Sequence, residues 1–463
     1  MTQTPHRARE SHAGALGARY VGPAAILLLV IAYAVLWWFA RPAPTVVPLG
    51  DDDGGSGGYF GQFLGAEAIL LLSISLVLIS TLQFVDRWFD GIDRAAIWHR
   101  RTAIAGCLLL IPHMLLSDGE IESAWSGPLA FIGVAGLFGL AVWAILPRWR
   151  FFVPGRVRPP IERVLTTSPV LLAQRVLGGY DRWRLLHRTV GLFVAAGFIH
   201  GLLVGTMFGG SPLLRWSYVA VGGIGIAFYL YRELLARRLQ GLKDYQVESV
   251  VPLGGGLTEV TLKPLGPRIV FAPGQFALIY IETKEGWKRH PFSIASGSSE
   301  ENLRVTIKAL GDYTSRVPEL VEPGMPAVVD GPYGRFDRRR GTRRQLWIGA
   351  GVGVAPFMSW VRSLDPEGER EVDFFHIYQG PSPFAEEIHA AAIEHPDFHP
   401  HVIDSTRDAK LTPAAALAVL DVPLDEVTVF MCGPGPMLRD FERAFRKAGI
   451  RHQRIHREHF DWR

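Results

Sequence analysis

Two apolar segments of this chain each carry a histidine near either end. His99 and His113 stand 14 positions apart in WHRRTAIAGCLLLIPHML, and His187 and His200 stand 13 positions apart in LHRTVGLFVAAGFIHGLL. A helix rises about 1.5 Å per residue, so each pair spans roughly 20 Å along a helix axis. The hydrocarbon core of a bilayer is about 30 Å thick, so each helix would hold one histidine towards each face of a membrane.

Histidines at these depths favour a metal-binding role. Ionisable side chains inside a membrane are costly and mark functional sites, and neutral imidazole is an axial ligand of haem iron. Two helices that run in the same direction would place His99 opposite His187 and His113 opposite His200. A single membrane histidine is as often a hydrogen-bond donor between helices. Four in two matched pairs instead predict two bis-histidine haem b sites, stacked across the membrane.

The two spacings differ in their helical geometry. Fourteen residues are close to four turns, so His99 and His113 share one face of a helix, whereas thirteen residues leave His200 about 140° from His187. We therefore expect the second helix to be distorted, at Gly191 or Gly197.

The distribution of charge predicts the membrane topology. Six apolar segments are long enough to span a bilayer: 21–40, 63–85, 98–117, 128–147, 187–208 and 213–232. The loop 148–186 holds eight arginines, whereas loops 42–62 and 117–127 are acidic. The positive-inside rule then places both termini in the cytoplasm and makes the third and fifth spans run outward. His99 and His187 would hold the inner haem, and His113 and His200 the outer haem.

This topology predicts a protein integral to the plasma membrane. Residues 1–20 would form a cytoplasmic tail, and 21–238 a transmembrane di-haem domain that retains its first span rather than losing it as a signal peptide. Two cysteines, Cys107 and Cys432, cannot supply a cysteine-ligated iron–sulfur cluster. The net charge of +4 is modest and the arginines follow membrane loops, so nucleic-acid binding is not expected.

The sequence pattern changes after residue 240. Short strands broken by glycine and proline predict a small antiparallel β-barrel over 240–338. Over 340–463, strands alternate with helices, which predicts a parallel α/β domain with nucleotide-binding topology. The predicted fold is thus a multidomain membrane protein, with a six-helix transmembrane haem bundle, an antiparallel β-barrel and an α/β domain.

Two motifs in the barrel region suit a flavin. HPFSIAS covers His290–Ser296, where strand-edge backbone and Ser293 can bind a flavin ring. KALGDYTSR follows, and its Lys308, Gly311 and Thr314 can hold a pyrophosphate.

Two further motifs lie in the α/β region. GAGVGVAPF (Gly349–Phe357) directly follows a predicted strand and enters a helix, so its glycines permit a tight turn and the helix N-terminus faces phosphate. MCGPGPM (Met431–Met437) follows another strand, at the carboxyl edge where ligands bind. Within it, a small buried core residue is the commoner role for a cysteine such as Cys432.

Together these motifs resemble known families. Residues 270–463 resemble the ferredoxin–NADP reductase superfamily, and the chain from about residue 60 resembles the NADPH oxidase and ferric reductase family. The resemblance implies FAD at HPFS, NADPH or NADH at GAGVGVAP and CGP, and the four histidines as haem ligands. It also implies that Phe460 covers the flavin ring and yields to nicotinamide, with Glu458 and Cys432 beside the hydride path. The expected cofactor-binding residues are His290, Pro291, Phe292, Ser293, Lys308, Gly311, Thr314, Gly349, Gly351, Gly353, Pro356, Cys432, Gly433 and Phe460.

Two positions depart from the animal superoxide-producing oxidases. This chain has Ser117 where those proteins carry a further histidine one turn after the outer ligand, and Glu67 where they place an arginine in the second span. Both changes remove positive charge from the expected oxygen site, which argues against superoxide as the physiological product.

The electron count leads to a functional hypothesis. NAD(P)H gives two electrons as a hydride, haem iron takes one, and FAD converts between them. We expect a transmembrane oxidoreductase that passes electrons from cytosolic NAD(P)H through FAD and two haems to an extracytoplasmic acceptor, with dioxygen, ferric chelates and quinones as candidates. Two alternatives remain: an electron donor to an extracytoplasmic partner reductase, and a cytosolic flavin reductase with a haem-free membrane anchor. The choice between NADPH and NADH stays open.

Overall fold

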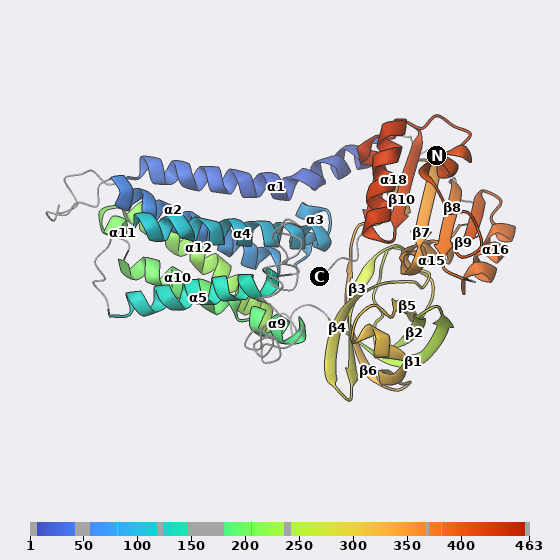
Figure 1. Ribbon diagram of the computed structural model, residues 1–463, viewed down its shortest axis with the longest axis horizontal. Coiled ribbons are helices and arrows are strands. Elements are labelled where there is room, and N and C mark those ends of the chain that lie inside the picture. Colours follow the sequence, from blue (N-terminus) through green and yellow to red (C-terminus); the bar gives the residue numbers. More distant parts are fainter. Residues whose placement is uncertain are drawn as a thin grey trace, which may run out of the picture. The chain divides into compact units, whose positions relative to one another are not determined.

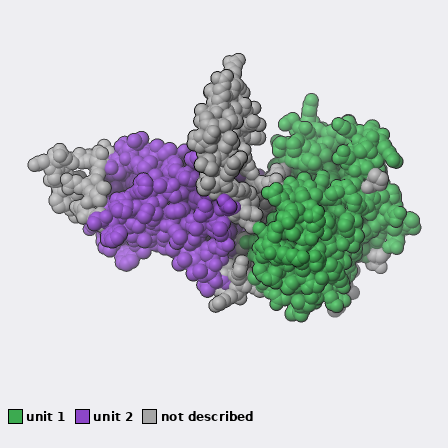
Figure 2. All heavy atoms as spheres, turned by 60° about the horizontal axis from the view of Figure 1, so that its bottom comes forward, with its two compact units in different colours: residues 1–19, 86–93, 237–463 green, residues 20–85, 94–236 purple. Residues whose placement is uncertain are grey.

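The computed structural model describes residues 7–41, 56–80, 82–117, 124–145, 180–204, 206–235, 242–365, 370–380 and 382–458. The chain divides into two compact units (Figure 2). One consists of residues 20–85 and 94–236 and is called here the helical unit; the other consists of residues 1–19, 86–93 and 237–463 and is called the sheet unit.

The N-terminal half of the chain is helical (Figure 1). Its elements are α1 (Arg7–Phe39), α2 (Ser56–Leu78), α3 (Gln83–Phe89), α4 (Ile92–Leu116), α5 (Ser126–Ile145), α9 (Tyr180–His187), α10 (Val190–Val204), α11 (Thr206–Gly210), α12 (Pro212–Leu230) and the π-helical turn η4 (Tyr231–Leu235). Long apolar runs favour such helices because a bilayer leaves no other partner for backbone polar groups.

Several of these helices have the length and composition of membrane spans. Within the described residues there are five: Tyr20–Phe39, Gly58–Leu78, Ser126–Trp143, Leu185–Val204 and Pro212–Leu235. The predicted third span forms helix α4, which has 25 residues but is not among the five. Its two histidines, together with Arg100 and Arg101, lower its mean hydropathy. The sixth span therefore remains a prediction.

The second histidine-bearing segment is interrupted, but not where the sequence suggested. Helix α9 ends at His187 and α10 begins at Val190, so the distortion lies at residues 188 and 189 and not at Gly191 or Gly197. The break separates His187 from the helix that bears His200, which allows the two rings to be oriented independently despite their 13-residue spacing.

Residues of helix α12 and of the turn η4 that follows it hydrogen-bond to the residues between α9 and α10. The Arg188 guanidinium binds the Glu233 carboxylate, with an Nε–Oε2 distance of 2.9 Å, and the Tyr229 hydroxyl donates to the Arg188 carbonyl oxygen at 2.9 Å. The Leu186 carbonyl oxygen near the end of α9 accepts from the Thr189 hydroxyl at 2.7 Å and from the Thr189 backbone amide at 3.0 Å.

The first part of the sheet unit is an antiparallel sheet of six strands. They are β1 (Lys243–Gly254), β2 (Leu257–Pro264), β3 (Phe276–Thr283), β4 (Gly286–Ser293), β5 (Leu303–Lys308) and β6 (Pro326–Tyr333), in the order β4-β3-β6-β1-β2-β5. A bridge between Ile294 and Val305 brings the two ends of the sheet together. Short helices η5 (Thr314–Arg316), α14 (Val317–Leu320) and η6 (Arg338–Arg340) follow the last two strands.

The second part is a parallel sheet covered by helices. Its strands are β7 (Arg344–Ala350), β8 (Glu371–Tyr378), β9 (Phe398–Asp404), β10 (Val427–Cys432) and β11 (Ile455–Glu458), in the order β11-β10-β7-β8-β9. The helices are η7 (Gly351–Val354), α15 (Ala355–Val361), α16 (Ala385–Glu394), α17 (Pro413–Ala418), α18 (Gly435–Ala448) and η8 (His452–Arg454). Central strands β7 and β10 are buried along their whole length, as their apolar sequences predict.

The described part of this unit therefore contains the predicted antiparallel β region and the predicted parallel α/β region. Strand β11 was not anticipated from the sequence. It is short, and it pairs with β10 only because α18 returns the chain to that edge of the sheet.

A short segment between α2 and α4 belongs to the sheet unit. Its Asp90 carboxylate lies 3.6 Å from Arg335 and 3.1 Å from Arg340, and Asp90 is almost buried there. Ile92 packs with Phe276 and other apolar residues of the antiparallel sheet. Asp90 also adopts a left-handed backbone conformation with φ of 55°. Ion pairs, apolar contact and backbone conformation thus fix residues 86–93 on this sheet.

We predict that Asp90→Ala destabilises the sheet unit by about 1–3 kcal/mol, because it leaves two guanidinium groups without their shared partner and strains the left-handed backbone. The measurement is the temperature at which flavin fluorescence appears on heating the purified full-length protein. Asp90→Asn is the control, since asparagine tolerates this conformation and removes only the charge. An unchanged transition in Asp90→Ala would show that the ion pairs do not hold the segment.

Candidate functional site

Three of the four predicted haem histidines point Nδ1 at a backbone carbonyl oxygen. The Nδ1–O distances are 2.9 Å from His99 to Ser75, 2.8 Å from His113 to Gly61, and 3.0 Å from His200 to Ser126. A carbonyl oxygen only accepts hydrogen bonds, so Nδ1 carries the proton in each case. The lone pair of Nε2 is then available for a metal, as in histidines that ligate metals elsewhere.

The acceptors repeat the spacing of the histidines. Gly61 and Ser75 stand 14 positions apart on α2 (61 to 75), as His99 and His113 do on α4 (99 to 113). Helices α2 and α4 therefore run antiparallel and side by side (Figure 1). The Ser117 hydroxyl lies 3.1 Å from His113 Nδ1, so the residue that replaces a histidine of the animal oxidases contacts the predicted outer ligand.

The separation of the predicted inner pair suits one metal ion. The ring centres of His99 and His187 are 6.2 Å apart, with 80° between the ring planes. Imidazole binds metals at about 2 Å, so two rings on opposite sides of one iron have centres roughly 6 Å apart. Trp183 stacks on the His187 ring at 4.7 Å. The donor set, its tautomers and this separation fit a bis-histidine haem.

Glycines of α2 allow it to approach the histidine helix closely. Gly61 and Gly65 form a GxxxG pair, a pattern that brings membrane helices together. A Cβ atom at Gly65 would lie 2.8 Å from the His113 ring, and one at Gly61 would lie 2.8 Å from the backbone of Leu116. The His113 ring is therefore confined by the backbone of α2.

The two motifs of the antiparallel sheet lie side by side. The His290 ring stacks on Tyr313 with ring centres 4.4 Å apart and planes 4° apart. Burial raises the pKa of Tyr313 to about 12, so its phenol stays neutral. Ser293 is buried, and its hydroxyl has no hydrogen-bond partner within the described residues, which leaves it available to a ligand. Thr314 accepts from the amide of Gly311 at 3.0 Å and thereby shapes the predicted pyrophosphate loop.

The remaining flavin-motif residues lie on or after these strands. Pro291 and Phe292 pair with Leu278 and Ala277 on β3, at the centre of the motif. Lys308, which ends β5, extends towards the glycine-rich loop: its Nζ lies 3.5 Å from the position of a Cβ on Gly351. Lys308 thus borders the nucleotide motif as well as the flavin motif.

The two nucleotide motifs meet at the carboxyl edge of the parallel sheet. Gly351 has φ of 58°, a left-handed conformation that favours glycine. A Cβ at Gly353 would lie 2.3 Å from the Cys432 carbonyl oxygen, so the two loops touch through backbone. Gly349 is the buried penultimate residue of β7, and Pro356 occupies the first turn of α15. Gly433 continues from Cys432 into the loop before α18.

The residues expected beside the hydride path are also brought together. Cys432 on β10 pairs in register with Glu458 on β11. Cys432 is fully buried within an apolar cluster that includes Phe357 and Phe430. Burial, reinforced by Glu458, raises the pKa of the Cys432 thiol well above its usual value, so the thiol stays protonated and is no nucleophile. Phe460 lies outside the described residues.

One residue near the nucleotide motif escaped sequence reasoning. His376 on β8 is buried, with Nε2 2.7 Å from the Ser382 hydroxyl and Nδ1 3.4 Å from the Gly349 carbonyl oxygen. Burial lowers the pKa of His376 to about 4, so the ring is neutral. The neutral His376 ring therefore contacts the backbone of Gly349, the first glycine of the motif. The sequence feature that could have identified His376 is a histidine within the otherwise apolar strand EVDFFHIY.

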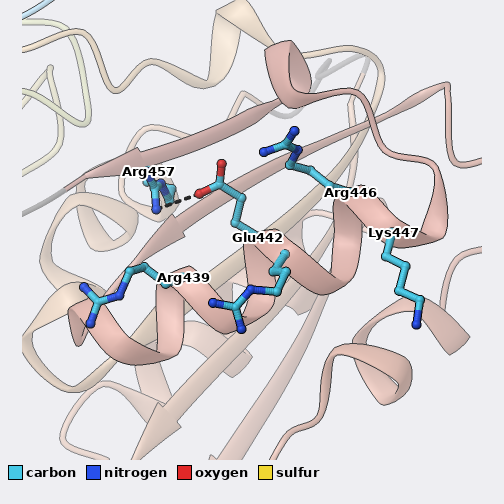
Figure 3. A pocket seen from close by; sticks show the side chains of 6 residues that line it. Arg439, Glu442, Arg446, Lys447 and Arg457 are labelled. Carbon is cyan, nitrogen blue, oxygen red and sulfur yellow. Dashed lines mark ion pairs between the residues drawn. The ribbon is translucent and has the colours of Figure 1, made fainter.

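A pocket on α18 is separate from these motifs (Figure 3). Five basic side chains and Glu442 line it: Arg439, Arg443, Arg446, Lys447 and Arg457. Arg457 binds the Glu442 carboxylate at 2.6 Å. None of the predicted site residues lines this pocket.

Comparisons with known proteins bear on the sheet unit. An FAD-binding domain family matches residues 244–337. The ferredoxin reductase component of 3-ketosteroid-9-alpha-monooxygenase from Rhodococcus rhodochrous is 28% identical over 205 residues, which cover 42% of this chain and 58% of that protein. NADPH oxidase 1 from Mus musculus is 28% identical over 162 residues, which cover 34% of this chain and 26% of that protein.

The resemblance to the NADPH oxidase and ferric reductase family is confirmed. The expected enzyme class, an NAD(P)H-dependent oxidoreductase, is confirmed for the flavin-binding half of the chain. A solved FAD/NAD-binding domain of nitric oxide dioxygenase from Vibrio cholerae covers 47% of this chain and 97% of that domain, with 19% identity and a TM-score of 0.42. The chain spans 58% of the length of the Rhodococcus relative, so the activity of the whole protein is treated below as a proposal.

We predict that Gly65→Val lowers the haem content of the purified protein, because the new side chain displaces His113. Gly58→Val is the matched control, since it lies on the same helix and a Cβ there meets nothing within 4 Å. Pyridine haemochrome analysis measures the result. Equal haem content in the two variants would mean that the contact with α2 does not position His113.

We predict that Gly351→Val raises the KM for NAD(P)H at least tenfold and leaves FAD bound. The substitution strains a left-handed backbone and places methyl groups where a nucleotide phosphate would approach Lys308. Gly266→Val, in a loop with open space around it, is the control. Steady-state kinetics and flavin absorbance test both. Loss of FAD with a normal KM would reverse the roles assigned to the two motifs.

Proposed function

We propose that this chain is a transmembrane oxidoreductase. In this proposal it passes electrons from cytosolic NADPH or NADH through FAD and two haem b groups to an acceptor outside the cytoplasm. Residues 21–238 form the di-haem domain in the plasma membrane with both termini in the cytoplasm, 240–338 bind FAD, and 340–463 bind the nucleotide. The observation that carries the proposal is the set of histidines whose Nδ1 atoms are held by backbone carbonyls, together with the FAD-binding domain.

The sheet unit would perform the first step. The glycine loop after β7 lets backbone approach the nucleotide phosphates, and Lys308 adds a cation beside Gly351. Ser293 supplies a buried hydroxyl to the flavin, and the stacked pair of His290 and Tyr313 forms part of the wall beside it. FAD, when bound, accepts the hydride and releases its two electrons singly. The protonated Cys432 and the adjacent Glu458 would border the nicotinamide, and Phe460 would cover the flavin between turnovers.

The helical unit would perform the second step. It would hold three of the four imidazoles in one tautomer, with the Nε2 lone pair left for a metal, through the carbonyl groups of Ser75, Gly61 and Ser126. His187 sits at a helix end and is oriented by stacking on Trp183. Imidazoles fixed in this way would lower the rearrangement needed when a bound iron changes its charge.

We predict that His113→Leu and His200→Leu each remove one haem and abolish transmembrane reduction, while the sheet unit still reduces a soluble dye. The reason is that the outer ligands belong to the helical unit and do not take part in hydride transfer. His389→Leu, an exposed histidine on α16, is the matched control. Haem content and acceptor reduction in liposomes are measured together.

The outcomes distinguish the alternatives. If both His113→Leu and His200→Leu retain two haems per chain, the assignment of these histidines as haem ligands is wrong. A wild-type protein without haem would leave a flavin reductase with a membrane anchor. Haem reduction by NAD(P)H without reduction of any small acceptor would favour an electron donor to an extracytoplasmic partner reductase.

A further inference from the structure

The carboxyl group of Glu67 lies unpartnered in the interior of the helical unit. The side chain is 3% exposed, and within the described residues neither carboxyl oxygen has a hydrogen-bond partner. An ionised carboxylate without a partner carries a large solvation cost in such a place. Glu67 is therefore held as the neutral acid, a group that can give up a proton.

Two further polar groups of the same cluster have incomplete hydrogen bonds. The Tyr33 hydroxyl and the Trp37 indole NH, both on α1, are buried and make no complete hydrogen bond in the described part of the chain. Tyr33 interacts electrostatically with Glu67, and its hydroxyl lies beside the Trp37 indole nitrogen and the Ser217 hydroxyl. Buried polar groups in proteins almost always have partners. An acid without a partner, beside two donors whose hydrogen bonds are incomplete, indicates a site for a polar ligand.

The surroundings of this cluster are apolar and aromatic. Tyr33 and Trp37 belong to a buried cluster with Ile69, Phe198 and Phe208. The rings of Trp37 and Phe208 are 6.2 Å apart. A ligand recognised by these groups would present a flat apolar body and a few hydrogen-bond acceptors.

The cluster lies on the helix that also contacts the predicted outer ligand. Gly65, two positions before Glu67 on α2, confines the His113 ring. Glu67 lies halfway along α2, at the depth of Gly65, and Trp37 lies near the end of α1, which in the proposed topology is towards the outer face. Electrons that reach the outer haem would thus arrive close to the cluster.

The chemistry of the candidate acceptors selects among them. Ferric chelates and dioxygen each take one electron without a proton, and ferric chelates are ionic and would not enter an apolar interior. A quinone is lipid-soluble, and its carbonyl oxygens can accept from Tyr33 and Trp37. It takes up two electrons and two protons. Of these candidate acceptors, the quinone is the one whose reduction requires protons, which a buried acid can supply.

We propose that Tyr33, Trp37 and Glu67 form a quinone site and that Glu67 delivers protons to the reduced ring. The proposal names the acceptor class of the proposed function and rests on that function. NAD(P)H is oxidised to NAD(P)⁺ and releases two electrons and one proton on its own side, while the quinone takes up two electrons and two protons to give a quinol. The two electrons would arrive singly through the haems, and two O–H bonds form on the quinone. Each proton leaves by breaking the O–H bond of Glu67, and the carboxylate regains a proton from the outer aqueous side.

The test follows reoxidation of haem in the full-length protein in nanodiscs. Haem is first reduced with a limiting amount of NADPH or NADH without oxygen, and then mixed with decylubiquinone or with ferricyanide, which needs no proton. The variants are Glu67→Gln, which keeps the shape but not the acid, Glu67→Asp, and Tyr33→Phe. Ser73→Ala is the control, a buried polar residue of the same helix outside the cluster.

We expect Glu67→Gln to slow haem reoxidation by the quinone at least tenfold and to leave reoxidation by ferricyanide within twofold of wild type. Glu67→Asp should retain part of the quinone rate, Tyr33→Phe should weaken quinone binding, and Ser73→Ala should match wild type. A wild-type quinone rate in Glu67→Gln overturns the proposal. So does an equal loss with both acceptors, or a wild-type protein whose haem the quinone does not reoxidise.

Failure of the proposed function itself is visible earlier in the same experiment. If NAD(P)H does not reduce haem in the wild-type protein, the electron path is wrong before any quinone is added, and the quinone proposal falls with it. Normal haem reduction followed by a wild-type quinone rate in Glu67→Gln overturns the quinone site alone.

Discussion

The hydrogen bonds from imidazole Nδ1 to backbone carbonyls are the constraint on which the helical unit depends. A carbonyl oxygen cannot donate, so these bonds at His99, His113 and His200 settle the tautomer without any charged partner. They also tie α4 to α2, and α10 to the start of α5. The same contacts that join the helices therefore leave Nε2 free to bind a metal, and packing and ligand geometry cannot be separated here.

In the sheet unit, the main constraint is that the backbone of the glycine-rich loops must be able to approach the phosphates of a nucleotide. Adjacent parallel strands β7 and β10 end at the same edge, where the loops around Gly353 and Cys432 touch through main-chain atoms. Side chains would block this approach, so glycine occupies the contact. Lys308 reaches this edge from the antiparallel sheet, which makes the two sheets contribute to one site.

Two polar residues of the helical unit, Ser117 and Glu67, distinguish this chain from the animal oxidases it resembles. Ser117 contacts the His113 ring, and Glu67 is a buried acid. The family resemblance implies a further histidine and an arginine at these two positions in the animal oxidases. An apolar interior with two hydrogen-bond donors and an acid differs in its electrostatics from a site built to hold an anion. In the proposed function, these few side chains would suit a different acceptor.

The sequence by itself determined the features that depend on neighbours along the chain. Apolar runs specified helices, glycine-rich turns specified the ends of β7 and β10, and the 14-residue spacing placed His99 and His113 on one face of α4. Contacts between distant segments were decided by the tertiary structure. The break at residues 188 and 189 depends on Glu233 and Tyr229, β11 depends on the return of α18, and the pairing of Asp90 with two arginines depends on the antiparallel sheet. Local periodicity carries no information about such partners, because their energies arise only once the chain has packed.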